Sequence, residues 1–145
     1  MPETMFEHVG GEETLRKLAS AFHHAVMDDP LLAPLFAYSG QQHAENLTKY
    51  FTEVFSGPPL FTEELGGFEY IKNRHARLRI TEQQRTRFVE LMLRAGEEVG
   101  LPTDERFQTA WRTWVDRAAG FSMKASHLTD EQLAEVHSSL GRWDW

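Results

Sequence analysis

Residues 22–36 read FHHAVMDDPLLAPLF, and this stretch holds most of the information about how the chain folds. It begins inside an apolar stripe at helical spacing, which predicts a core helix from Leu15 to Val26. Pro30 and Pro34 follow soon after, and proline interrupts a helix because it lacks the backbone N–H. We therefore expect a helix and then a short, turn-like connection over residues 30–36. The stripe consists of Leu15, Leu18, Phe22, Ala25 and Val26.

A second helix is predicted after this connection. Ser39 and Gln42 have the spacing of a capping box, and an apolar stripe follows them to about Phe55. The segment from Gly57 to Arg79 is interrupted by Gly and Pro, so its residue pattern predicts little regular structure. The apolar stripe of the second helix consists of Ala44, Leu47, Phe51, Val54 and Phe55.

Three more helices are predicted in the second half of the chain. Thr81 and Gln84 repeat the capping-box spacing at the start of a helix that Gly100 closes. Thr103 caps the next helix, and Thr129 begins a short final one. No run of alternating β-branched residues predicts a strand. The fold class is therefore all-α, with helices packed across one another around a shared core.

Length and composition exclude several kinds of protein. At 145 residues the chain is long enough for one domain with its own core. It has no Cys, which excludes disulfides, thiolate metal sites and thiol nucleophiles. Its formal charge of −7 disfavours nucleic acid as a partner. Neither a signal peptide nor an apolar run of membrane-spanning length is present, so we expect a cytoplasmic protein with a small or neutral partner and no membrane contact.

The seven histidines are the candidates for chemistry in a chain without Cys. None of them has the spacing of a zinc pair on a helix or of the Glu-x-x-His motif of a di-iron bundle. Haem needs less from the sequence, namely one axial imidazole and an apolar slot. His23 and His43 lie on or beside predicted core-facing surfaces, where an imidazole needs a partner or a metal. The seven are His8, His23, His24, His43, His75, His127 and His137.

Several segments resemble the truncated haemoglobins, and specifically their second group. Residues 22–36 are similar, without a gap, to that group's segment from Phe-Tyr-x-x-Val to Pro-Leu-Phe. Residues 74–80, RHARLRI, resemble the Arg-His motif that carries the proximal iron ligand. The resemblance covers roughly residues 10–122. Glycine breaks fall at the family's positions in Gly10-Gly11, Ser56-Gly57-Pro58 and Gly66-Gly67.

This resemblance implies a shortened globin fold, a two-over-two helical sandwich over residues 1–122. Residues 123–145 would form a C-terminal extension with a short helix and a Trp-rich end. The cofactor would be haem b, with His75 as the proximal ligand of the iron. The resemblance also implies haem contacts from Phe36, Leu47, Tyr50, Phe51, Leu78 and Phe88, and propionate contacts from Lys72, Arg74 and Arg77.

Two positions on the distal side depart from the family pattern. His23 stands where the family usually has Tyr, and Phe88 stands where the second group usually has Trp. Phe donates no hydrogen bond, so polar control of an iron ligand falls to His23, to His43 or to water between them. His43 matches the family position that faces the distal side of the iron. It would act there as a distal ligand or a hydrogen-bond donor, with His23 orienting it.

The function that the resemblance implies is reversible binding, and hence transport, of a diatomic ligand, O₂ or NO, at haem iron. Redox or detoxification activity would need a reductase, and whether the protein is an enzyme stays open. Two alternatives remain: a peroxidase-like or small-molecule-reducing haem enzyme, and a bis-histidyl haem protein that senses or transfers electrons. The chain ends RWDW, residues 142–145. We expect its Trp side chains to dock on the body of the protein, with a homodimer contact as the alternative.

Overall fold

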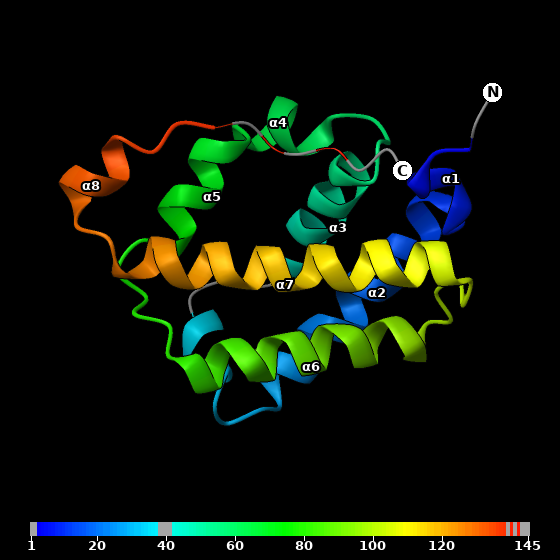
Figure 1. Cartoon of the computed structure of the whole chain (residues 1–145), viewed down its shortest axis with the longest axis horizontal. Helices are drawn as coiled ribbons and strands as arrows, with labels where there is room; N and C mark the ends of the chain where they lie inside the picture. Colours follow the sequence, from blue (N-terminus) through cyan, green and yellow to red (C-terminus); the bar gives the residue numbers. More distant parts are fainter. Residues whose placement is uncertain (1–2, 38–41, 139, 141, 143–145) are drawn as a thin grey trace.

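The computed structural model describes residues 3–37, 42–138, 140 and 142, and this part of the chain is helical without a β-strand (Figure 1). The predicted all-α class is therefore confirmed. None of the helices in these residues combines the length and the apolar character that crossing a membrane requires. The elements are α1 (Met5–His8), α2 (Gly11–Met27), the 3-10 helix η1 (Ala33–Phe36), α3 (His43–Val54), α4 (Leu60–Leu65), α5 (Phe68–His75), α6 (Glu82–Glu98), α7 (Glu105–His127) and α8 (Asp130–Ala134).

Two pairs of helices form the two layers of the fold. Helices α6 and α7 run antiparallel and side by side across the front of Figure 1, and α2 and α3 lie behind them. Helix α2 joins the layers because it packs against both α3 and α6. This arrangement is the predicted two-over-two sandwich. The largest side chains of its core, each at most 2 % exposed, are Phe22, Phe51, Phe55, Phe107 and Trp111.

The helix starts follow their capping residues. Thr81 and Thr129 form complete capping boxes at the starts of α6 and α8, as predicted. The predicted cap of α7 at Thr103 is wrong by one residue, because the carboxylate of Asp104 accepts the first-turn backbone N–H at 2.9 Å. The predicted cap at Ser39 lies outside the described residues.

Two short helices, α4 and α5, occupy a segment whose residue pattern predicts little regular structure, so that prediction is wrong. Helix α4 is held from outside, because the buried carboxylate of Glu53 on α3 accepts hydrogen bonds from the backbone N–H and the hydroxyl of Thr62. Gly66 and Gly67 both have positive φ angles, 100° and 68°, which let the chain turn into α5. Helices of six and eight residues are too short for apolar periodicity to reveal them.

Helix α1 has no counterpart among the predicted helices. Thr4 forms a capping box with Glu7 at its start, which is a local signal within only four helical residues. The backbone N–H of Phe6 donates to Phe55 O at 2.7 Å and so fastens α1 to the end of α3. This short helix therefore depends on a contact that is remote in sequence.

The chain after α7 returns across the molecule. Helix α7 continues past residue 122 without a break, and the division into residues 1–122 and 123–145 stays a prediction. Beyond α8 the chain passes over α5 towards α4 (Figure 1). Trp143 and Trp145 lie outside the described residues, so the docking expected of them also stays a prediction.

Candidate functional site

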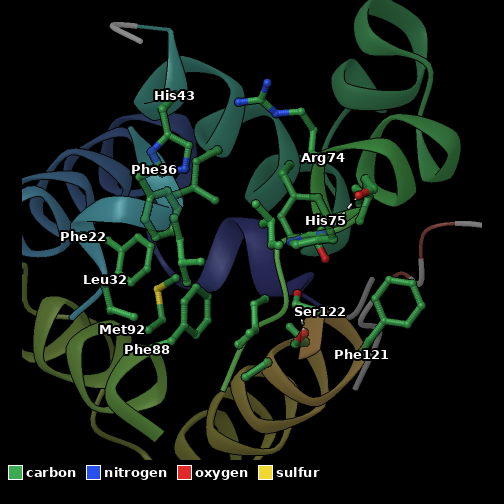
Figure 2. A pocket seen from close by; sticks show the side chains of 18 of the residues that line it. Phe22, Leu32, Phe36, His43, Arg74, His75, Phe88, Met92, Phe121 and Ser122 are labelled. Carbon is green, nitrogen blue, oxygen red and sulfur yellow. Dashed lines mark hydrogen bonds between the residues drawn. The ribbon is translucent and has the colours of Figure 1, made fainter. Parts of the chain in front are cut away.

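A cavity of about 290 Å³ lies between the α3, α5, α6 and α7 helices, with η1 at one side (Figure 2). Its lining is mostly aromatic and aliphatic, which is the usual character of a small-molecule site. His43 and His75 enter it from α3 and α5. Most residues predicted for the site line this cavity: Phe36, His43, Leu47, Tyr50, Phe51, Arg74, His75, Leu78 and Phe88.

His75 is the last residue of α5 and has one nitrogen suited to coordinate a metal. Its Nδ1 lies 2.9 Å from Ile71 O. Because a carbonyl oxygen only accepts, Nδ1 carries the proton and Nε2 carries the lone pair. Burial lowers the pKa of His75 and outweighs the Ile71 hydrogen bond, which raises it, so the ring is neutral at pH 7. A neutral imidazole that is oriented through Nδ1 is the arrangement found in metal-binding histidines.

His43 and His23 form a hydrogen-bonded pair at the other end of the cavity. His43 is the first residue of α3, and its Nδ1 lies 2.9 Å from Nδ1 of His23 on α2. Burial, with smaller contributions from the charges of His23 and Arg74, lowers the pKa of His43 to about 4. His43 is therefore neutral at pH 7. The structure brings the predicted distal pair together, with His43 in the cavity wall and His23 behind it.

An aromatic wall adjoins His43. The Phe22 ring meets the Phe88 ring edge-on, with centroids 5.0 Å apart, and it meets the Phe36 ring at 6.3 Å. Phe36 also packs on His43, with ring centroids 4.9 Å apart. Phenyl rings donate no conventional hydrogen bond, so within this aromatic group only His43 offers a polar atom to the cavity.

The basic residues predicted to contact the propionates do not all reach the cavity. Arg74 lines it, whereas the amine of Lys72 is buried elsewhere and donates to Val136 O at 2.9 Å. Arg77 lies beyond the end of α5, where its exposed guanidinium pairs with Asp130. The fold thus corrects the expectation for Lys72 and Arg77. Their positive charges are engaged by other parts of the chain.

Further polar groups on the cavity wall were absent from the predicted set. Asn46 Nδ2 on α3 donates to the hydroxyl of Tyr70 on α5 at 3.2 Å, and the Tyr70 ring lies under Arg74, 5.8 Å from its guanidinium carbon. Tyr70 precedes Arg74 by four residues, so a predicted α5 would have placed both on one face. Arg85 Nε is buried with no hydrogen-bond partner among the described residues, and no sequence signal indicated its place in the wall.

This donor set fits an iron porphyrin better than a metal ion bound by protein ligands alone. In the described ranges, no three His, Asp or Glu side chains gather where they could hold one ion. A single neutral imidazole such as His75 therefore suits a metal whose other ligands belong to its own organic ring, and the apolar lining suits that ring. The N–H groups of Arg74 and the unpaired Arg85 Nε are donors that carboxylate groups of such a ring could accept from.

The chain is similar in sequence to known globins. The sequence profile of the bacterial-like globin family matches residues 4–120. A curated relative, the group 2 truncated hemoglobin YjbI of Bacillus subtilis (strain 168), is 30% identical over 129 residues, which are 89% of this chain and 91% of the relative.

Solved structures of globins share its fold. The hemoglobin of Chloroflexus aurantiacus aligns with a TM-score of 0.75 and 30% identity, over 84% of this chain and 98% of that one. The truncated oxygen-avid haemoglobin of Bacillus subtilis aligns with a TM-score of 0.73 and 28% identity, over 83% of this chain and 98% of that one. In both cases nearly the whole of the solved chain has a counterpart here.

Proposed function

Because the chain belongs to the bacterial-like globin family, among the group II truncated haemoglobins, we propose that it binds haem b through His75 and reversibly takes up O₂ or NO on the side of His43. Haem binding is a property of this family. The observation that carries the finer proposal is His75 itself. Its ring is neutral, is oriented by Ile71 O and lines an apolar cavity.

The residues around the cavity have distinct tasks in this proposal. Haem supplies an iron atom that coordinates a small gas and changes its oxidation state. The hydrogen bond from His75 Nδ1 to Ile71 O holds the ring in one orientation and makes Nε2 a better electron donor. Phe36 and Phe51 exclude water from the cavity, and Arg74 offers charged N–H donors to a propionate.

The contact between His23 and His43 decides what His43 presents to the cavity. If His23 Nδ1 donates, the proton of His43 sits on Nε2, and His43 is a hydrogen-bond donor to a gas. If His43 Nδ1 donates, its Nε2 carries the lone pair, and His43 is a second metal ligand. The two tautomers therefore correspond to an open gas-binding site and to a closed bis-histidyl site.

A second candidate function, reduction of hydrogen peroxide, is favoured by the same pair of imidazoles. Each peroxide molecule would take up two electrons and two protons and leave as two molecules of water. A neutral His43 is suited to accept a proton from one peroxide oxygen and return it to the other, because the histidine behind it can share that proton. The electrons would come from an external reductase.

Optical and vibrational spectra of the purified protein test the primary proposal. We expect one haem b per chain and, in the ferrous state, an iron–imidazole stretching band that disappears in His75→Gly. Purified protein that takes up no haem, or a His75→Gly variant that keeps the band, would refute the assignment.

Peroxide turnover with a phenolic reductant tests the second candidate. If His43 acts as acid and base, His43→Leu should lower the catalytic constant for peroxide by about a hundredfold, which is the usual size of such a contribution. Equal turnover by the wild type and His43→Leu would exclude peroxide reduction as a function of this pair.

A further inference from the structure

Lys72 is a buried cation that the proposed haem chemistry does not use. Its side chain is 4 % exposed, although lysine is seldom buried unless it is paired. The amine donates to Val136 O at 2.9 Å and forms an ion pair with Glu69 at 3.0 Å. Val136 follows α8, so this buried charge joins α5 to the segment after α8.

Lys72 belongs to the helical turn that orients His75. It lies three residues before His75, and its own carbonyl accepts the hydrogen bond of Ala76 N at 3.1 Å, which closes α5. The neighbouring carbonyl, Ile71 O, accepts from His75 Nδ1. A displacement of this turn would therefore change the direction in which His75 Nε2 points.

The segment after His75 is fastened by the same part of the chain. The Ser126 hydroxyl accepts a hydrogen bond from Ile80 N at 3.0 Å, and Ser126 O accepts one from Arg79 N at 3.2 Å. His127 Nε2 lies 2.7 Å from Ile80 O. Residues on both sides of the proposed iron ligand thus depend on residues 126–136.

Two ion-paired or hydrogen-bonded arginines extend this attachment. Arg77 pairs with Asp130 at the start of α8, and Arg142 Nη2 donates to Gly57 O at 2.7 Å. Gly57 lies in the turn between α3 and α4. The described part of residues 126–142 therefore reaches from the end of α7, past α5, to the turn between α3 and α4.

All of this segment lies beyond the residues that match the family profile. The bacterial-like globin profile ends at residue 120. The alignment with the Chloroflexus aurantiacus hemoglobin covers 98% of that chain and 84% of this one. The attachment therefore uses residues outside the family profile, although the match to the group 2 truncated hemoglobin YjbI spans 129 residues of this chain and so reaches the beginning of the segment.

We propose that the described part of residues 126–142, namely 126–138, 140 and 142, forms a strap that holds α5 against the body, and that Lys72 is the positioning residue through which the strap orients His75 and slows the loss of haem. This inference rests on the proposed role of His75 as iron ligand. The strap acts through the backbone of one helical turn. Its loss should therefore change the iron–imidazole bond even in a variant that keeps the native fold.

The test compares haem-loaded wild type with Lys72→Met, which keeps the length of the side chain and removes its charge and donors. We expect haem transfer to excess apomyoglobin to become about tenfold faster, as fits the loss of a hydrogen bond from a charged group. We also expect the ferrous iron–imidazole stretching band to shift or broaden. Lys49→Met is the matched control, because Lys49 on α3 pairs with Glu64 on α4, outside the strap.

Each result decides the matter. A folded Lys72→Met protein that keeps the wild-type rate of haem transfer and the wild-type iron–imidazole band would overturn the proposed role of the strap. If Lys72→Met fails to fold, Arg142→Ala decides, because Arg142 donates to Gly57 O at the far anchor of the strap. A transfer rate raised a few-fold supports the strap, and an unchanged rate overturns it. Absence of the iron–imidazole band from the wild type would instead refute the role of His75, which separates the two failures.

Discussion

His23 and His43 meet nitrogen to nitrogen, with their Nδ1 atoms 2.9 Å apart. Two acceptors or two donors would repel at this distance, so one ring must hold a proton between them and the other must accept it. The position of the proton in this contact therefore determines whether Nε2 of His43 carries a proton or a lone pair. Both histidines must therefore be substituted, each in its own variant, to show what the pair does at the cavity.

We predict that His43→Leu and His23→Leu change the ferric spectrum to different extents. If His43 coordinates iron, His43→Leu should convert a low-spin spectrum to that of water-bound iron, and His23→Leu should shift the equilibrium less. If His43 only donates a hydrogen bond, the wild type should already resemble the water-bound form, and His43→Leu should speed gas dissociation. A spectrum and dissociation rate that are both unchanged in His43→Leu would contradict either role.

The lowered pKa of His43 predicts a loss of stability in acid. The pKa is about 4 in the folded protein against 6.5 in the unfolded chain, so between these pH values the unfolded chain binds a proton that the folded chain does not. The free energy of unfolding should fall as pH falls through this window, by at most about 3 kcal/mol from His43, and stay level above it. Burial of His75 acts in the same direction.

Urea unfolding of the haem-free protein at pH 7 and pH 5 measures this effect. The difference between the two pH values should be smaller in His43→Leu than in the wild type. The control is His24→Leu, which removes an exposed histidine of α2. An equal difference in wild type and His43→Leu would show that His43 titrates alike in the folded and unfolded chains.

Replacement of His75 by Gly should empty the proximal side. The ring is oriented through Ile71 O, and no backbone group can replace its Nε2 as a ligand. We expect haem retention to fall by more than tenfold, and free imidazole added in excess to restore part of it. His24→Ala, which removes an exposed histidine of α2 outside the cavity lining, is a control for nonspecific effects of losing a histidine.

The longer helices could be predicted because each carries several turns of one apolar stripe. Helices α2, α6 and α7 have 17, 17 and 23 residues, and their buried side chains recur at helical spacing. Helix α5 has eight residues and begins at Gly67, whose φ of 68° is a backbone state that sequence periodicity does not encode. Its stability comes from packing and from residues far along the chain.

The basic residues were misassigned because the residue pattern did not predict helix α5. Ile71, Arg74 and His75 line the cavity at spacings of three and four residues, which is one face of α5. Lys72 falls on another face, where it meets Val136. The residue pattern predicted no helix here and so could not separate the cations near His75. The resemblance to a family assigned them instead, and it misplaced Lys72 and Arg77.

Phe88→Trp should slow the release of O₂. Phe88 lines the cavity edge-on to Phe22, and an indole ring would add an N–H donor where the second group usually has one. We expect dissociation about tenfold slower, as fits one added hydrogen bond, measured by stopped flow. Phe88→Leu changes the size of the side chain without adding a donor, so equal rates in the Trp and Leu variants would refute the explanation.

Glu53→Gln should destabilise the fold through α4. Glu53 is 5 % exposed and accepts hydrogen bonds from both Thr62 N, at 2.7 Å, and the Thr62 hydroxyl. An amide has one acceptor oxygen in place of two, so we expect a loss of about 1–3 kcal/mol in urea unfolding. The control is Glu64→Gln, at an exposed position of α4, which should change the free energy of unfolding by less than about 0.5 kcal/mol.

The contacts that attach α5 to residues 126–142 can form only late in the synthesis of the chain. Lys72 is separated from Val136 by 64 residues, and Ile80 from Ser126 by 46, so the ribosome makes these partners long after α5 itself. Helices α2 and α3, whose contacts are closer in sequence, can pair on a nascent chain before those partners exist. A growing chain therefore presents His75 on an unanchored helix. Capture of the cofactor should be a late event, completed only when residues 126–142 have left the ribosome.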